Sequence, residues 1–126
     1  FFAAFVAVGW RPGDTFPSGD QLAAASGAAF TAVVIGQVAN AFACRSARRW
    51  PGAVGWTSNR LLLGAVAVEL VALAGFLFVP PVASLLDHRP PPVSAAAVAL
   101  LAAPAVLAAD ASHKAWRRRR GAVATE

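Results

Sequence analysis

Apolar residues fall in four blocks along the chain, separated by short stretches rich in proline, glycine and arginine. Three blocks approach or reach the roughly 20 residues that cross a hydrocarbon core of about 30 Å as a helix. They run from about Ala23 to Cys44, from Leu61 to Val79 and from Val93 to Ala109. The opening block, Phe1 to Trp10, is too short to cross alone. The pattern predicts three full membrane helices after a partial one.

Backbone groups in lipid must bond within their own structure, so blocks of this length are helices, and no alternating pattern indicates a barrel. We expect an all-α fold, a polytopic membrane bundle with one partial and three full transmembrane helices. The chain contains no methionine, not even an initiator. The partial helix is therefore interpreted as the second half of a helix that begins upstream. A secretory signal is the competing interpretation, but the opening block lacks a basic n-region.

The distribution of charged residues predicts which side of the membrane each connecting segment faces. The chain is 58% hydrophobic and only 13% charged, which is unlike a soluble domain. Nine of its eleven cations lie between the second and third blocks or after the last one: Arg45, Arg48, Arg49, Arg60, Lys114 and Arg117 to Arg120. The positive-inside bias places that loop and the C-terminus in the cytoplasm of a multi-pass cell-membrane protein. A basic tail beside a helix end is attracted to anionic headgroups of the bilayer, and we expect no nucleic acid partner.

Three polar residues inside the apolar blocks are candidates for ion binding. Gln37 and Asn40 lie one turn apart on one helix, and an amide in hydrocarbon needs a partner inside the protein. Glu69 lies roughly 13 Å along its helix from Arg60, near the middle of the bilayer. It should be protonated, paired, or facing a bound ion. The competing interpretation is structural, with amides that only link helices and a carboxyl paired within the bundle.

Other positions predict local structure. Ser58-Asn59 offers an N-cap for the third block, and Pro80-Pro81 ends that block. The connector 45–60 is expected to be short of secondary structure, and the segment 79–92 is expected to be a proline-rich loop. Pro104 predicts a kink in the last helix.

Smaller features suggest no further chemistry. The single cysteine, Cys44, permits no internal disulfide or thiolate metal cluster. Asp110 and Lys114, four positions apart, are expected to form a solvated ion pair. His88 is expected to be exposed in its loop, without a second metal ligand. No catalytic residue and no certain metal ligand emerges.

A resemblance to a known family emerges from the order of these motifs. QxxN in one helix is followed by RSARR, by SNRLLL leading to ELVALAGFL, by VPP, and by AADASHKAWRRRR at the end. This order resembles the C-terminal membrane domain of bacterial type II cation-transporting P-type ATPases, which are similar to animal calcium and sodium pumps. The resemblance covers residues 1–126, from the end of the seventh helix through the tenth, with 110–126 as a basic cytoplasmic tail.

The resemblance implies roles for the same three polar residues. Gln37 matches an eighth-helix position that is a glutamate ligand in calcium pumps and a glutamine in sodium pumps. Asn40 matches an aspartate that lines an ion site in sodium pumps, and Glu69 falls at a ninth-helix glutamate of that region. An amide thus replaces a carboxylate at one of the two positions, whichever relative is used. Because Ca²⁺ prefers several carboxylate oxygens, the resemblance does not name the ion.

The resemblance also implies partners and cofactors. The chain would contact the lipid bilayer, the transported cation, and the upstream transport and cytoplasmic domains of the same pump. ATP and Mg²⁺ are expected in the full-length pump and no cofactor within this segment, because the DKTG-type phosphorylation motif does not occur here. We therefore expect a fragment of a pump that is not catalytic on its own. The alternatives are a small standalone multi-span scaffold or interaction protein, and a minimal proton or solute carrier that uses Glu69.

Overall fold

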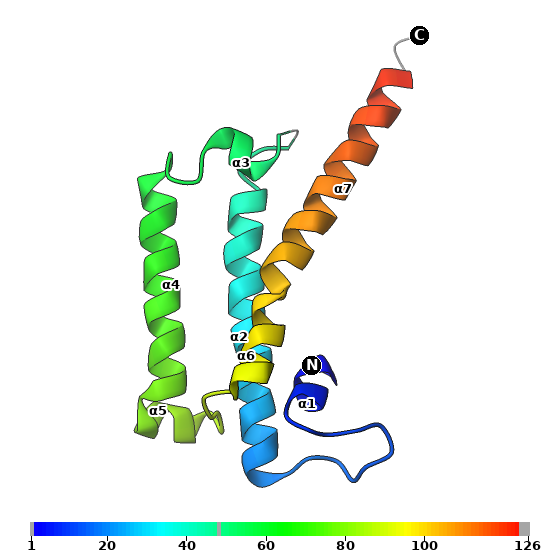
Figure 1. Cartoon of the computed structure of the whole chain (residues 1–126). Helices are drawn as coiled ribbons and strands as arrows, with labels where there is room; N and C mark the ends of the chain where they lie inside the picture. The colour runs from blue at the N-terminus through cyan, green and yellow to red at the C-terminus, as the bar shows by residue number, and fades with distance from the viewer. Residues whose placement is uncertain (1, 48, 124–126) are drawn as a thin grey trace.

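The computed structural model of the chain describes residues 2–47 and 49–123, and throughout these residues the regular secondary structure is helical, without a strand (Figure 1). This confirms the predicted all-α class. The helices are α1 Phe2–Ala7, α2 Gly19–Ala43, α3 Pro51–Val54, α4 Arg60–Phe78, α5 Pro80–Leu85, α6 Val93–Leu100 and α7 Ala102–Val123.

Three segments of the described chain are long and apolar enough to cross a membrane: Gly19–Ala43, Arg60–Phe78 and Val93–Arg120. The third segment joins α6 and α7. Together with the short α1, they confirm the prediction of three spans and a shorter N-terminal helix. The largest difference between the predicted blocks and the observed helices is at the C-terminal end. The predicted block ends at about Ala109, whereas α7 continues through the arginine run to Val123.

The two connecting segments contain helices that the sequence analysis did not predict. The prolines that end α4 also begin α5, because a proline in the first helical turn has no N–H to lose and a φ angle suited to the helix. In the other connector, Pro51 begins the single turn of α3 in the same way. The predicted cap of α4 is confirmed at Asn59, whose side chain accepts a hydrogen bond from the Leu62 N–H at 3.1 Å.

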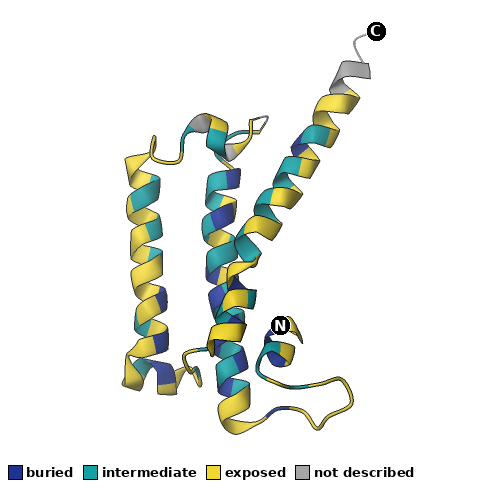
Figure 2. Ribbon diagram, in the orientation of Figure 1, coloured by how far each residue is buried: buried dark blue, intermediate teal, exposed yellow. Residues whose placement is uncertain are grey.

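Helix α2 is the central element of the bundle, and α1, α4, α6 and α7 all pack against it. Buried positions are spread along α2, whereas α4 is mostly exposed (Figure 2). The largest buried cluster joins α1, α2 and α6 and consists of Ala4, Phe5, Ala25, Ala28 and Ala95. Since four of its five members are alanines, these helices approach each other closely, as is common for helices in membranes.

Helices α2 and α4 pack through a smaller cluster of Val34, Leu73 and Leu77, with Phe30 against it. The ring of Phe30 also meets the ring of His88, with centroids 5.3 Å apart. His88 is therefore half-buried, and the expectation that it is exposed is wrong.

The segment between α5 and α6 is fastened to the start of α2. The Arg89 N–H donates to the Ala23 carbonyl at 3.2 Å, and the Arg89 guanidinium forms an exposed ion pair with Asp20 at 2.8 Å. The carbonyl of Arg89 lies so close to Gly27 that a Cβ there would be 2.2 Å away. Only glycine therefore fits at position 27 without a shift of the loop backbone.

The last span is interrupted as predicted from Pro104. Helix α6 ends at Leu100 and α7 begins at Ala102. Leu100 is four residues before Pro104, and Leu101, between the two helices, is three residues before it. Proline has no N–H to donate to the carbonyl four residues earlier, so the helix breaks there. Beyond the break, α7 continues along α2 and extends past its end.

Candidate functional site

Gln37 and Asn40 lie on the uncovered side of α2. Between positions 31 and 44, the exposed residues are Val33, Gln37, Asn40 and Cys44. Their spacing of four, three and four residues puts them in one stripe along the helix. The stripe lies between the side that packs on α4 and the side that packs on α7. The two amides share a face as predicted, but no other helix of the described chain covers it.

The polar groups of this stripe make few contacts within the described residues. The thiol of Cys44 lies 3.6 Å from Oδ1 of Asn40, a weak hydrogen bond within one turn. The side chain of Gln37 makes no hydrogen bond there. In hydrocarbon, an amide without a partner costs several kcal/mol, typically about 2 to 7. Both amides therefore have hydrogen-bonding capacity that this part of the chain leaves unused.

Glu69 occupies the middle of α4, with nine residues of the helix before it and nine after it. It is half-buried and forms no ion pair or hydrogen bond with its side chain among the described residues. It lies one and two turns before Leu73 and Leu77, the two buried residues of α4, and therefore on the side of α4 that faces α2. Glu69 thus marks the point at which the buried packing of α4 stops.

The contact between Gly27 and Leu77 serves as a reference point from which the positions of the three candidates along the helix axes, here called their heights, can be compared. Leu77 Cδ2 lies 3.3 Å from where a Cβ on Gly27 would stand. At about 1.5 Å per residue, Glu69 lies about 12 Å from that contact, Gln37 about 15 Å and Asn40 about 20 Å, all in the same direction. Side chains lean toward the N-terminus of their own helix, so those of Gln37 and Glu69 lean toward each other's level.

The structure thus brings Gln37 and Glu69 to nearly the same height and places Asn40 about one turn further along. None of the three is hydrogen-bonded to another among the described residues. No group of three or more His, Cys, Asp or Glu side chains suited to a metal ion occurs in that part of the chain either. An ion site that used these residues would need further ligands from outside the described bundle.

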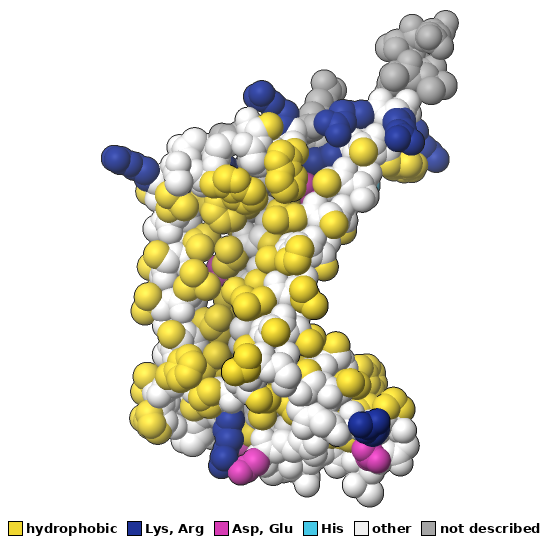
Figure 3. Space-filling model, in the orientation of Figure 1, with side chains coloured by type: hydrophobic (Ala, Val, Ile, Leu, Met, Phe, Trp, Pro, Cys, Tyr) yellow, Lys and Arg dark blue, Asp and Glu magenta, His cyan; other side chains and the backbone are white. Residues whose placement is uncertain are grey.

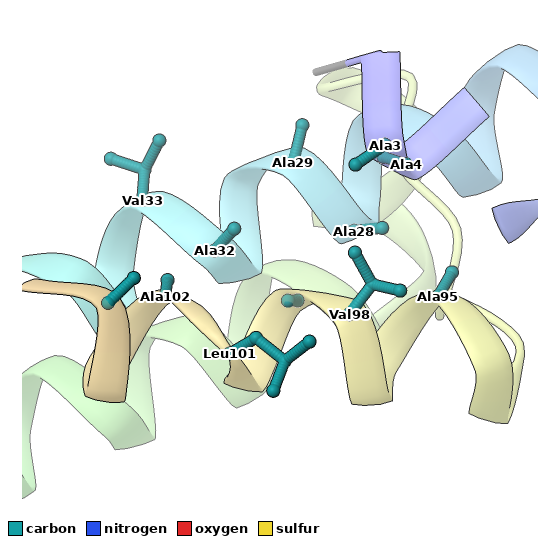
Figure 4. Close-up of a pocket in the computed structure, with 12 residues that line it drawn as sticks. Ala3, Ala4, Ala28, Ala29, Ala32, Val33, Ala95, Val98, Leu101 and Ala102 are labelled. Carbon is teal, nitrogen blue, oxygen red and sulfur yellow. The ribbon is translucent and has the colours of Figure 1, made fainter. Parts of the chain in front are cut away.

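A groove of about 560 Å³ lies between α1, α2, α6 and α7 (Figure 4). The labelled side chains that line it, such as Ala28, Val33, Val98 and Leu101, are apolar, and its other lining residues are alanines. It therefore offers no side-chain oxygen or nitrogen to a cation. The groove is separate from the polar candidates, although Val33 lies one turn before Gln37 on α2.

Charged side chains divide the bundle into two ends. Figure 3 shows Lys and Arg side chains gathered where α3 lies and where α7 ends, and we call this the basic end. It contains Arg45, which donates to the Gly55 carbonyl at 2.7 Å and to the hydroxyl of Ser58. The three polar candidates lie between this end and the contact of Gly27 with Leu77.

One polar contact at the basic end differs from its prediction. Lys114 is buried, with 5% of its surface exposed, and donates to Asp110 at 2.6 Å and to the Ala43 carbonyl at 2.8 Å. The expectation of a solvated pair is therefore wrong. The spacing of four residues predicted the pair, but the burial depends on the approach of α2, which the sequence pattern does not show.

A comparison with models of known protein families gives a match over most of the chain. Residues 1–116 match the model described as "Cation transporting ATPase, C-terminus". No curated protein and no solved structure matches the chain. Because the match covers nearly all of the sequence, it supports the resemblance stated above at the level of the family. The chain belongs to the family of C-terminal regions of cation-transporting ATPases.

Proposed function

We propose that the chain forms the last membrane helices of a P-type ATPase that couples ATP hydrolysis to cation transport. In this proposal α1 is the end of the seventh helix, α2 the eighth, α4 the ninth, and α6 with α7 the tenth. ATP and Mg²⁺ would bind to other domains of the pump. The family match supports this role, and the three apolar segments are of the length that it requires.

We infer that Glu69, Gln37 and Asn40 contribute part of an ion site. The observation that carries this inference is Glu69, a carboxyl at the midpoint of a membrane helix that has no partner among the described residues. An acidic side chain at this depth costs about 2.5 to 3.5 kcal/mol unless it is paired, protonated or solvated. A bound cation is one source of the missing compensation, and Gln37 offers an amide oxygen at a similar height.

The remaining ligands would come from the upstream transport helices of the same pump. The exposed stripe on α2 supports this, because it presents both amides to whatever packs there. Glu69 is the single carboxylate among the three candidates, and Ca²⁺ prefers several hard carboxylate oxygens. This share of the site therefore suits a monovalent cation or a proton better than Ca²⁺, as in relatives of the sodium-pump type.

We further propose that the basic end faces the cytoplasm of a bacterial cell. The arginines of the connector 45–60 and of α7 favour that side by the positive-inside bias. Trp50, Trp56 and Trp116 lie at the same end and are partly exposed, at 47%, 43% and 49%, as residues at a membrane interface commonly are. Arg120 stacks on the ring of Trp116 at 4.1 Å, which keeps its charge close to that interface.

The test is ATPase activity of the reconstituted full-length protein across Ca²⁺, Na⁺, K⁺ and pH. We expect Glu69→Gln, Gln37→Ala and Asn40→Ala to raise the half-saturating concentration of one cation, or to change the pH dependence, with expression intact. Val33→Ala is the matched control, since Val33 lies on the same stripe without a polar group. Unchanged half-saturation in all three variants, with lower stability, would return these residues to a purely structural role.

A further inference from the structure

Lys114 is the most deeply buried charged group of the described chain. Its side chain is 6% exposed and that of Asp110 is 21% exposed. Lysine is almost never buried unless it is paired, and here two oxygens compensate the charge. One belongs to Asp110 on the same helix, and the other is the Ala43 carbonyl, 71 positions away in the sequence.

The Ala43 carbonyl belongs to the last turn of α2. The carbonyls of a last turn have no partner within the helix, and a cation near them also interacts favourably with the helix dipole. Helix α2 has no basic residue in its own last turn. Helix α7 supplies the missing cation through Lys114, so the cap of α2 is also a link between two spans.

Close packing along α2 and α7 allows Lys114 to reach that carbonyl. A Cβ on Gly36 would lie 3.9 Å from both Ala102 Cβ and Val106 Cγ2 of α7. Further along the same side of α2, Ala39 and Ala43 are 5% and 2% exposed. These small residues form a seam between the helices, and Lys114 closes the seam at the basic end.

We propose that Lys114 is a positioning residue that fixes the last turn of α2 against α7. That turn begins with Asn40, three residues before Ala43. The hydrogen bond from Lys114 to the Ala43 carbonyl, which we call the lock, thus sets the position of one of the three candidate ion ligands without contacting the ion itself. This last step rests on the proposed function, whereas the lock between α2 and α7 stands on the hydrogen bonds alone.

Cys44 provides a reporter for the lock that does not depend on transport. It caps α2, and its backbone N–H donates to the Asn40 carbonyl at 2.9 Å, a bond that must break when the last turn opens. Hydrogen exchange in the full-length protein, followed by mass spectrometry, gives the rate of deuterium labelling of this N–H, and we expect Lys114→Met to raise that rate about tenfold. That change corresponds to about 1.4 kcal/mol in the opening of the last turn. Arg117→Gln, which removes an exposed cation from α7, is the control.

A second variant separates the lock from the unpaired carboxylate that Lys114→Met leaves behind. The double change Asp110→Asn with Lys114→Met removes that charge and still lacks the bond to Ala43. We expect its labelling rate to stay raised, while Asp110→Asn alone, which keeps Lys114 on Ala43, stays near wild type. A labelling rate in Lys114→Met equal to that of wild type would overturn the proposal. A return to the wild-type rate in the double variant would overturn it as well.

Cation-dependent ATPase activity of the same variants tests the link to the ion site. A raised labelling rate with a shifted half-saturation for one cation supports both the lock and the role of Asn40. A raised labelling rate with an unchanged half-saturation keeps the lock and counts against Asn40 as a ligand. The two failures are therefore distinguishable.

Discussion

Gly27→Ala should destabilise the bundle, although alanine is the better helix former. A Cβ at this position would meet the Arg89 carbonyl oxygen at 2.2 Å and the Arg89 carbonyl carbon at 3.3 Å. Both atoms are backbone, so no side chain can rotate out of the way. The loop cannot withdraw freely either, because the Arg89 N–H is bonded to the Ala23 carbonyl at 3.2 Å.

The magnitude follows from three contributions. The oxygen must move by roughly 1 Å to reach an ordinary contact, and overpacking of this kind costs about 1 to 3 kcal/mol. The hydrogen bond to Ala23 weakens as the loop moves, which costs up to about 1 kcal/mol more. Replacing a helical glycine by alanine returns about 1 kcal/mol. The net loss in the free energy of unfolding is therefore up to about 3 kcal/mol relative to wild type, and about 1 to 4 kcal/mol relative to a helical glycine-to-alanine change without the clash.

Unfolding of the purified protein by SDS in mixed micelles, followed by circular dichroism, measures this loss. Gly64→Ala is the matched control, since Gly64 is also a helical glycine and a Cβ there would meet nothing within 4 Å. We expect Gly64→Ala to be neutral or slightly stabilising. Equal stability of the two variants would refute the close approach of the loop to α2.

Two further changes test the ends of the helices by the same measurement. Asn59→Ala should cost about 1 kcal/mol, because it removes the cap of the Leu62 N–H, while Asn59→Asp should keep most of the stability; a cap without effect would mean that α4 begins elsewhere. Asp20→Asn should leave the stability within about 0.5 kcal/mol of wild type, because its ion pair with Arg89 is exposed. A loss well above 1 kcal/mol would show that this ion pair fastens the loop more strongly than the backbone does.

The spans were predictable because hydrophobic length alone decides them in a membrane. The predicted block from Leu61 to Val79 differs from α4 by one residue at each end. Its limits are set by Asn59 and by Pro80, which act locally. Helix α5 was missed because a proline that ends one helix can begin the next, and the sequence pattern alone does not decide between a loop and a new turn.

Contacts between distant segments were not predictable from the same reasoning. The sequence identified Gly27 as a small residue that permits close packing, but not the loop carbonyl that requires it. It identified Asp110 and Lys114 as a pair, but not the burial that the end of α2 imposes on them. For Gln37, the helix and the polar face were predicted, whereas the side of α2 that stays uncovered depends on where α4 and α7 pack.

The two spans that carry the candidate residues are held in different ways. Helix α2 is fastened at one end by the loop at Arg89 and at the other end by Lys114. Helix α4 has its buried residues, Leu73 and Leu77, only in the half that follows Glu69. A shift of α2 would have to break contacts at both of its ends, whereas the half of α4 before Glu69 can move without breaking a buried contact. Any change in the surroundings of Glu69 is therefore accommodated more easily by α4 than by α2.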